Sequence, residues 1–80
     1  MTEEEILEGI AAVAREHLGW EGTLRPEMRL VGELRLDSLK LLTLAIEVEN
    51  RFRIRLDDQD ESQIETVADL VAAIRKRRAD

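Results

Sequence analysis

The chain has 80 residues, of which 44% are hydrophobic and 38% are charged, and its formal net charge is −6. This length allows one small folded domain, which we place at residues 1–80, with a core too modest to leave room for a separate catalytic cleft. The acidic balance argues against nucleic acid and anionic membranes as partners, since both attract basic surfaces. Without cysteine there is no disulfide, thiolate nucleophile or cysteine metal site, as is typical of a cytoplasmic protein.

The first segment predicts a helix that begins after Thr2. Glu5 follows the cap by three residues, as in a capping box, and the acidic first turn suits the helix dipole. Gly19 is expected to end this helix. The first residues of the chain are acidic and lack the apolar core of a signal peptide, and no later apolar run is long enough to span a membrane. The residues at helical spacing are Ile6, Leu7, Ile10, Val13, Ala14 and Leu18.

Residues 19–37 are expected to form a long loop, because Gly22, Pro26 and Gly32 interrupt regular structure. Loops of this length in a small domain are often functional. Apolar side chains recur often enough to hold the loop against the core. They are Trp20, Leu24, Met28, Leu30, Val31 and Leu34.

Residues 38–52 predict a second helix, whose apolar positions cover a broad arc. Such an arc indicates a central helix with several neighbours, and it leaves Leu39 and Ile46 near the edge, where they could be exposed. Residues 53–56 alternate polar and apolar side chains and are interpreted as an extended connector.

The acidic stretch 57–65 lacks the glycine and the final glutamate of a calcium-binding EF-hand loop, so we interpret it as a solvated face with a short helix at about 58–63. Thr66 and Asp69 then begin a last helix, and the basic run 75–78 suits its C-terminal dipole and solubility. The predicted fold is all-α: a small four-helix bundle, three main helices and one short one, with the long loop between the first two.

One tetrapeptide, Leu36-Asp37-Ser38-Leu39, marks a candidate site at the start of the second helix. Asp37 is placed to accept hydrogen bonds from amides of the first turn, which leaves the Ser38 hydroxyl pointing outward on a rigid element. No acid–base pair, metal cluster or phosphate-cradling glycine loop accompanies it, and His17 is best explained as a surface residue at a helix end. We therefore expect no catalytic residues, no metal site and no enzyme activity.

The chain resembles the acyl carrier proteins over nearly its whole length. The resemblance is carried by the Asp37-Ser38-Leu39 signature, by the spacing from Glu49 to Phe52, and by the run 64–69, which matches the family pattern I-x-T-V-x-D. These motifs have the family's spacing without a gap.

This resemblance implies a monomeric carrier whose Ser38 accepts 4′-phosphopantetheine from coenzyme A, through a separate phosphopantetheinyl transferase. The thiol of the arm would then hold acyl groups as thioesters for ligase, ketosynthase or acyltransferase partners in fatty-acid, polyketide or related biosynthesis. Asp37 would cap the helix and help the transferase to recognise it. Residues implied to contact partners are Arg35, Leu39, Lys40, Ile46 and Glu47. The core, able in this family to shelter an acyl chain, would contain Ile10, Val13, Leu42, Ala45, Phe52, Val67, Leu70, Val71 and Ile74.

Two features depart from the family pattern. Arg35 stands where the family usually has glycine, so either the loop avoids positive φ here or Arg35 is strained. Lys40, Thr43 and Arg51 occupy helix positions where acids are usual, and a change of charge on a docking surface alters partner choice. We therefore expect a dedicated carrier of a specialised pathway rather than a housekeeping fatty-acid carrier.

Two other interpretations stay open at this point. One is an aminoacyl or peptidyl carrier of a nonribosomal pathway, although Leu36-Asp37 before the serine favours acyl cargo. The other is a helical interaction module that keeps the fold without the modification, which the intact Ser38 argues against.

Overall fold

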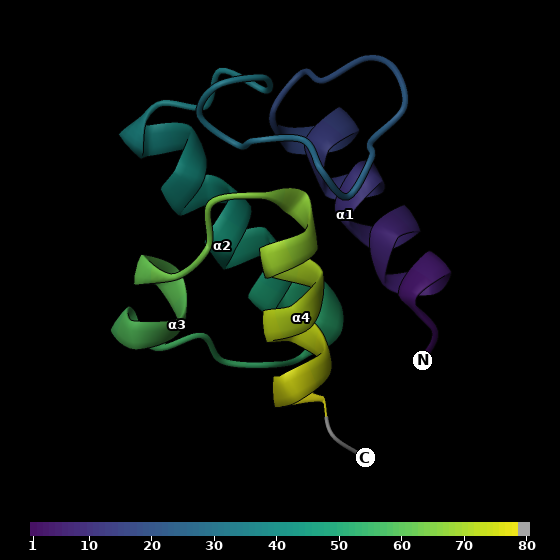
Figure 1. Cartoon of the computed structure of the whole chain (residues 1–80), viewed down its shortest axis with the longest axis vertical. Coiled ribbons are helices and arrows are strands. Elements are labelled where there is room, and N and C mark those ends of the chain that lie inside the picture. The colour runs from purple at the N-terminus through teal and green to yellow at the C-terminus, as the bar shows by residue number, and fades with distance from the viewer. Residues whose placement is uncertain (79–80) are drawn as a thin grey trace.

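The computed structural model describes residues 1–78 as four helices joined by loops (Figure 1). The helices are α1 (Glu3–His17), α2 (Ser38–Phe52), α3 (Asp58–Ser62) and α4 (Val67–Arg77). α1 packs against α2 and α4, and the short α3 lies to one side of the bundle. The all-α bundle predicted from the sequence is confirmed.

Side-chain caps begin the helices where the sequence predicts. Thr2 and Glu5 form a capping box at α1, and Thr66 and Asp69 form another at α4. These caps satisfy amides that have no partner within the helix. The Asp69 carboxylate also accepts hydrogen bonds from the Glu65 and Thr66 amides, and these hold its pKa below the ordinary value.

The long loop crosses one end of the bundle, at the top of Figure 1, and is tied to the start of α4. The amides of Val67 and Ala68 donate to the carbonyls of Met28 and Pro26 at 2.9 and 2.8 Å, and the Leu30 amide donates to the carbonyl of Glu65 at 3.0 Å. Loop carbonyls thus satisfy amides of the first turn of α4. This tie fixes the path by which the loop reaches α2.

The core is aliphatic apart from one aromatic ring, that of Phe52. Most positions of the predicted core are buried, but two predictions were wrong. Leu42 is 54% exposed, because the five-residue α3 covers only part of the broad apolar arc of α2. Val31 is 62% exposed, because it lies in a turn in which its neighbour Leu30 takes the buried position. The buried set is Ile6, Ile10, Val13, Ala14, Leu24, Leu30, Leu34, Leu36, Leu44, Val48, Phe52, Val67, Leu70, Val71 and Ile74.

Candidate functional site

Ser38 is the first residue of α2 and is exposed. Asp37 is the N-cap, and its Oδ1 accepts a hydrogen bond from the Lys40 amide at 2.8 Å. Because the carboxylate of Asp37 serves the backbone, the Ser38 hydroxyl makes no hydrogen bond with the residues that the structure describes. The arrangement is a free primary alcohol at a rigid helix start.

The backbone that leads to Ser38 is held between two buried leucines. Leu34 and Leu36 are 8% and 5% exposed, and the Leu36 amide donates to the carbonyl of Leu30 at 3.1 Å. Between them Arg35 is exposed and has φ 56°, in the left-handed region. Of the two possibilities that the sequence left open, the structure has the strained one, since non-glycine residues adopt this conformation at a cost.

An apolar surface without acidic side chains follows Ser38 along α2. Leu39, Leu42 and Ile46 are 72%, 54% and 45% exposed. The first turn of the helix contains no acid, and Lys40 there is exposed. The structure therefore leaves Leu39 and Ile46 accessible, as expected, and adds Leu42, a residue of the expected core.

The two acids of α2 are both engaged within the molecule. The Glu47 carboxylate lies 3.4 Å from the imidazole of His17, which is a surface residue at the end of α1, as expected. Glu49 accepts a hydrogen bond from the Leu56 amide at 2.7 Å and so braces the connector between α2 and α3. Lys40 and Arg35 have no such partner among residues 1–78.

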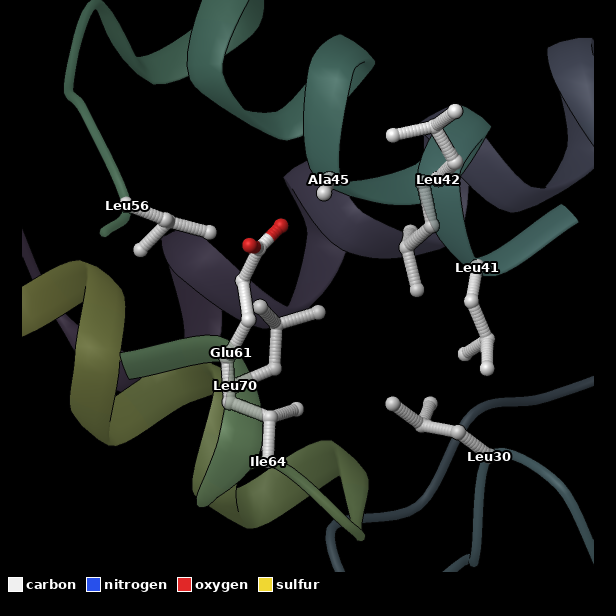
Figure 2. A pocket seen from close by; sticks show the side chains of 9 residues that line it. Leu30, Leu41, Leu42, Ala45, Leu56, Glu61, Ile64 and Leu70 are labelled. Carbon is white, nitrogen blue, oxygen red and sulfur yellow. The ribbon is translucent and has the colours of Figure 1, made fainter. Parts of the chain in front are cut away.

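A cavity of about 310 Å³ opens between α2, α3 and α4 (Figure 2). Its volume falls at the lower end of the range for small-molecule pockets. Its lining is apolar apart from one carboxylate. The lining residues are Leu30, Leu41, Leu42, Leu44, Ala45, Leu56, Glu61, Ile64 and Leu70.

The wall that α3 contributes is fastened to α4 by Arg77. Its guanidinium donates from Nε to Asp60 at 2.8 Å and from Nη2 to Asp57 at 3.0 Å, and Lys76 lies 3.8 Å from Asp60. Desolvation raises the pKa of Asp60, but hydrogen bonds from the Asp57 amide and Arg77 outweigh it and hold the pKa below its ordinary value.

The expectation of a fully solvated acidic face was therefore wrong at Asp60, which is 7% exposed. The basic run of α4 does more than complement the helix dipole. Arg75 pairs with Glu3 at 3.0 Å, and Arg78 donates to the carbonyl of Phe52 at 2.7 Å. The acidic stretch 57–65 and the basic run 75–78 were the signal in the sequence, but which of their residues pair depends on the packing of α3 on α4.

No cluster of His, Asp and Glu side chains within residues 1–78 has the arrangement of a metal site. None of the helices described combines the length and apolar character needed to cross a membrane.

Comparison with known proteins assigns the class. The family profile described as "Phosphopantetheine attachment site" matches residues 8–74. The chain is 36% identical over 77 residues to the meromycolate extension acyl carrier protein of Mycobacterium tuberculosis, across 95% of this chain and 67% of that protein. It is also 36% identical over 75 residues to an acyl carrier protein of Thermotoga maritima, across 92% of this chain and 93% of that one.

A solved structure agrees with these sequence matches. The acyl carrier protein of Enterococcus faecalis superimposes with a TM-score of 0.75 at 28% identity, over 96% of this chain and 99% of that one. The fold and the matching family profile thus define a phosphopantetheine-dependent carrier. The chain belongs to the acyl carrier protein family, whose members carry acyl groups on covalently attached 4′-phosphopantetheine.

Proposed function

We propose that Ser38 is the residue that receives the phosphopantetheine arm and that residues 1–80 act as one monomeric carrier domain. The observation that supports this best is that Ser38, preceded by the capping Asp37, is exposed at the start of α2 and that its hydroxyl makes no hydrogen bond within residues 1–78. Its oxygen is accessible for attack on the pantetheine-side phosphorus of coenzyme A. The serine would form a phosphodiester with phosphopantetheine as the pyrophosphate P–O bond breaks, adenosine 3′,5′-bisphosphate leaves and the hydroxyl gives up its proton to the transferase. The arm supplies the thiol that this cysteine-free chain lacks.

Intact mass spectrometry tests the site directly. Incubation with coenzyme A, magnesium and a transferase of broad specificity should add one phosphopantetheine to the parent chain and none to Ser38→Ala. The other serine of the chain provides the matched control, since Ser62→Ala should still be modified. Because Ser38 is exposed, its replacement by alanine should change the free energy of unfolding by no more than roughly 0.5 kcal/mol. An unmodified parent, or a modified Ser38→Ala, would contradict the proposal.

The surface around Ser38 is proposed as the docking surface for the transferase and for acyl-loading and acyl-processing enzymes in the cytoplasm. Leu39, Leu42 and Ile46 supply its apolar centre, Arg35 and Lys40 its charges, and Glu47 lies at its edge beside His17. Exposed apolar residues edged by charges are typical of interaction sites. Because the nearest free charges are positive, the fitting partner carries acids, which supports a dedicated carrier of a specialised pathway.

Charge reversal tests this docking surface. A ketosynthase with a basic carrier-binding face should use the loaded wild-type carrier poorly. Lys40→Glu should raise its kcat/KM several-fold, because one exposed charge contributes about 0.5–1 kcal/mol to such an interaction. Arg55→Glu, on the connector after α2, is the control and should have little effect. Use of the wild-type carrier as efficient as that of an ordinary fatty-acid carrier would argue against a specialised partner.

Acyl cargo is favoured over aminoacyl or peptidyl cargo. The cavity beside α2 is apolar over most of its lining, so it suits a hydrocarbon chain. We propose that the carrier itself performs no catalysis and that partner enzymes do the chemistry of loading and elongation.

A further inference from the structure

Among the described residues that line the cavity, Glu61 is the one with an ionisable side chain. The eight other lining residues are leucine, isoleucine or alanine. In Figure 2 the Glu61 side chain extends from α3 toward α2, and its carboxylate points toward Ala45. A chain held in this cavity would therefore pass a carboxylate set in an apolar wall.

Within residues 1–78 the carboxylate of Glu61 has no partner, in contrast to those of Asp57 and Asp60. Asp57 and Asp60 are both bonded to Arg77. Within the described residues, Glu61 makes no side-chain hydrogen bond or ion pair, and its side chain is exposed, so water solvates it while the cavity is empty.

A plain alkyl chain that enters the cavity would displace part of that water and offer the carboxylate nothing in return. A polar group that loses solvent without a new partner is destabilising, whereas a hydrogen bond to a charged group is among the stronger ones. A cargo with a hydroxyl or ammonium group facing Glu61 would replace the lost hydrogen bond.

We propose that Glu61 is a specificity-determining residue, which makes the cavity favour acyl chains that carry a hydrogen-bond donor over unsubstituted chains of the same length. The inference rests on the proposed function, because the arm on Ser38 must deliver the chain to the cavity. Hydroxyl and ammonium groups can both donate this hydrogen bond. The series of cargoes tests which of the two the cavity prefers.

The experiment uses the full chain loaded at Ser38 from synthetic acyl coenzyme A analogues. The set contains octanoyl, its hydroxyoctanoyl isomers with the hydroxyl at successive carbons, and the matching amino isomers. Occupancy of the cavity is measured from methyl chemical shifts of Ile64 and Leu70, which line it, relative to the carrier with an empty arm. At least one donor-bearing chain should occupy the cavity roughly tenfold more than octanoyl does.

Two variants and a control separate the carboxylate from general effects on α3. Glu61→Leu should reverse the order in favour of octanoyl, and Glu61→Gln should reduce the preference for the donor. Asp58→Asn removes the same charge from α3 at an exposed position outside the cavity lining and should leave the preference unchanged.

The outcomes separate the two proposals. Failure to load any arm on Ser38 would overturn the proposed function, and this inference with it. Loading followed by equal occupancy for octanoyl and every donor-bearing chain would overturn the role of Glu61 alone. So would a preference that survives in Glu61→Leu.

Discussion

At Arg35 the backbone adopts a conformation that its side chain disfavours. Its φ of 56° lies in the left-handed region, where a side chain beyond glycine costs about 1–2 kcal/mol. The conformation persists because Leu34 and Leu36 on either side are buried. The sequence showed that the glycine of the family was missing, but it held no information on φ, which depends on how the loop is anchored to the core.

Arg35→Gly should stabilise the protein or leave it unchanged. Relief of the left-handed strain is opposed by the greater entropy of glycine in the unfolded chain, so the gain should not exceed about 1 kcal/mol in the free energy of unfolding. Arg35→Val, a β-branched residue, should instead destabilise by a similar amount. Urea denaturation of the three proteins compares them, and a clear loss of stability in Arg35→Gly would show that the Arg35 side chain itself stabilises the loop.

At the scale of an element, α3 depends on contacts with α4 for its position. A helix of five residues is too short to be stable by itself. Its capping box between Asp57 and Asp60 and the guanidinium of Arg77 hold it against α4, which gives the cavity one of its walls. The charges of this segment therefore have a structural role.

Replacing Asp60 by asparagine should lower the melting temperature at neutral pH, and the loss should depend on pH. The pKa of Asp60 is lower in the folded protein than its ordinary value of 3.8, so the folded state binds this proton less readily than the unfolded state. The ionised Asp60 therefore stabilises the folded protein fully at pH values above 3.8, and this stabilisation is lost as the pH falls through the lower pKa of the folded state. The gap between parent and Asp60→Asn should therefore narrow below about pH 4.

Thermal denaturation at a series of pH values measures that gap. Asp58→Asn is the control, since Asp58 is exposed at the start of the same helix and has no side-chain partner within residues 1–78. A constant difference between parent and Asp60→Asn at every pH would show that shape, rather than charge, accounts for the effect.

At the scale of the whole molecule, the features predicted correctly are those encoded locally. The caps at Thr2, Asp37 and Thr66 and the helical spacing of apolar residues predicted three of the helices and the exposed serine. Contacts between distant residues, such as Arg77 with Asp60 and the loop with the start of α4, depend on how elements pack. The exposure of Leu42 also depends on how the elements pack, because α3 is too short to cover it.

The contact of Gly9 on α1 with the Phe52 ring of α2 is also a packing feature that no local pattern indicated. Gly9 is buried on α1, and a Cβ atom placed there would lie 2.4 Å from Cζ of the Phe52 ring. Phe52 is 3% exposed, so its ring has little room to move. A glycine that looks unfavourable within a helix thus allows the two helices to meet around the aromatic ring.

Gly9→Ala should therefore destabilise the protein even though alanine is the better helix former by about 1 kcal/mol. Overpacking costs about 1–3 kcal/mol, so we expect a net loss of up to about 2 kcal/mol, while Phe52→Ala should cost about 3–5 kcal/mol by leaving a cavity. The double variant should be more stable than the sum of the two losses predicts, because the added methyl group then enters the space of the missing ring.

Gly32→Ala, where a Cβ atom would be 3.6 Å from Arg29, is the control and should cost little. Urea unfolding of the four variants and the parent measures the cycle, and strict additivity would mean that Gly9 and Phe52 do not set the distance between α1 and α2.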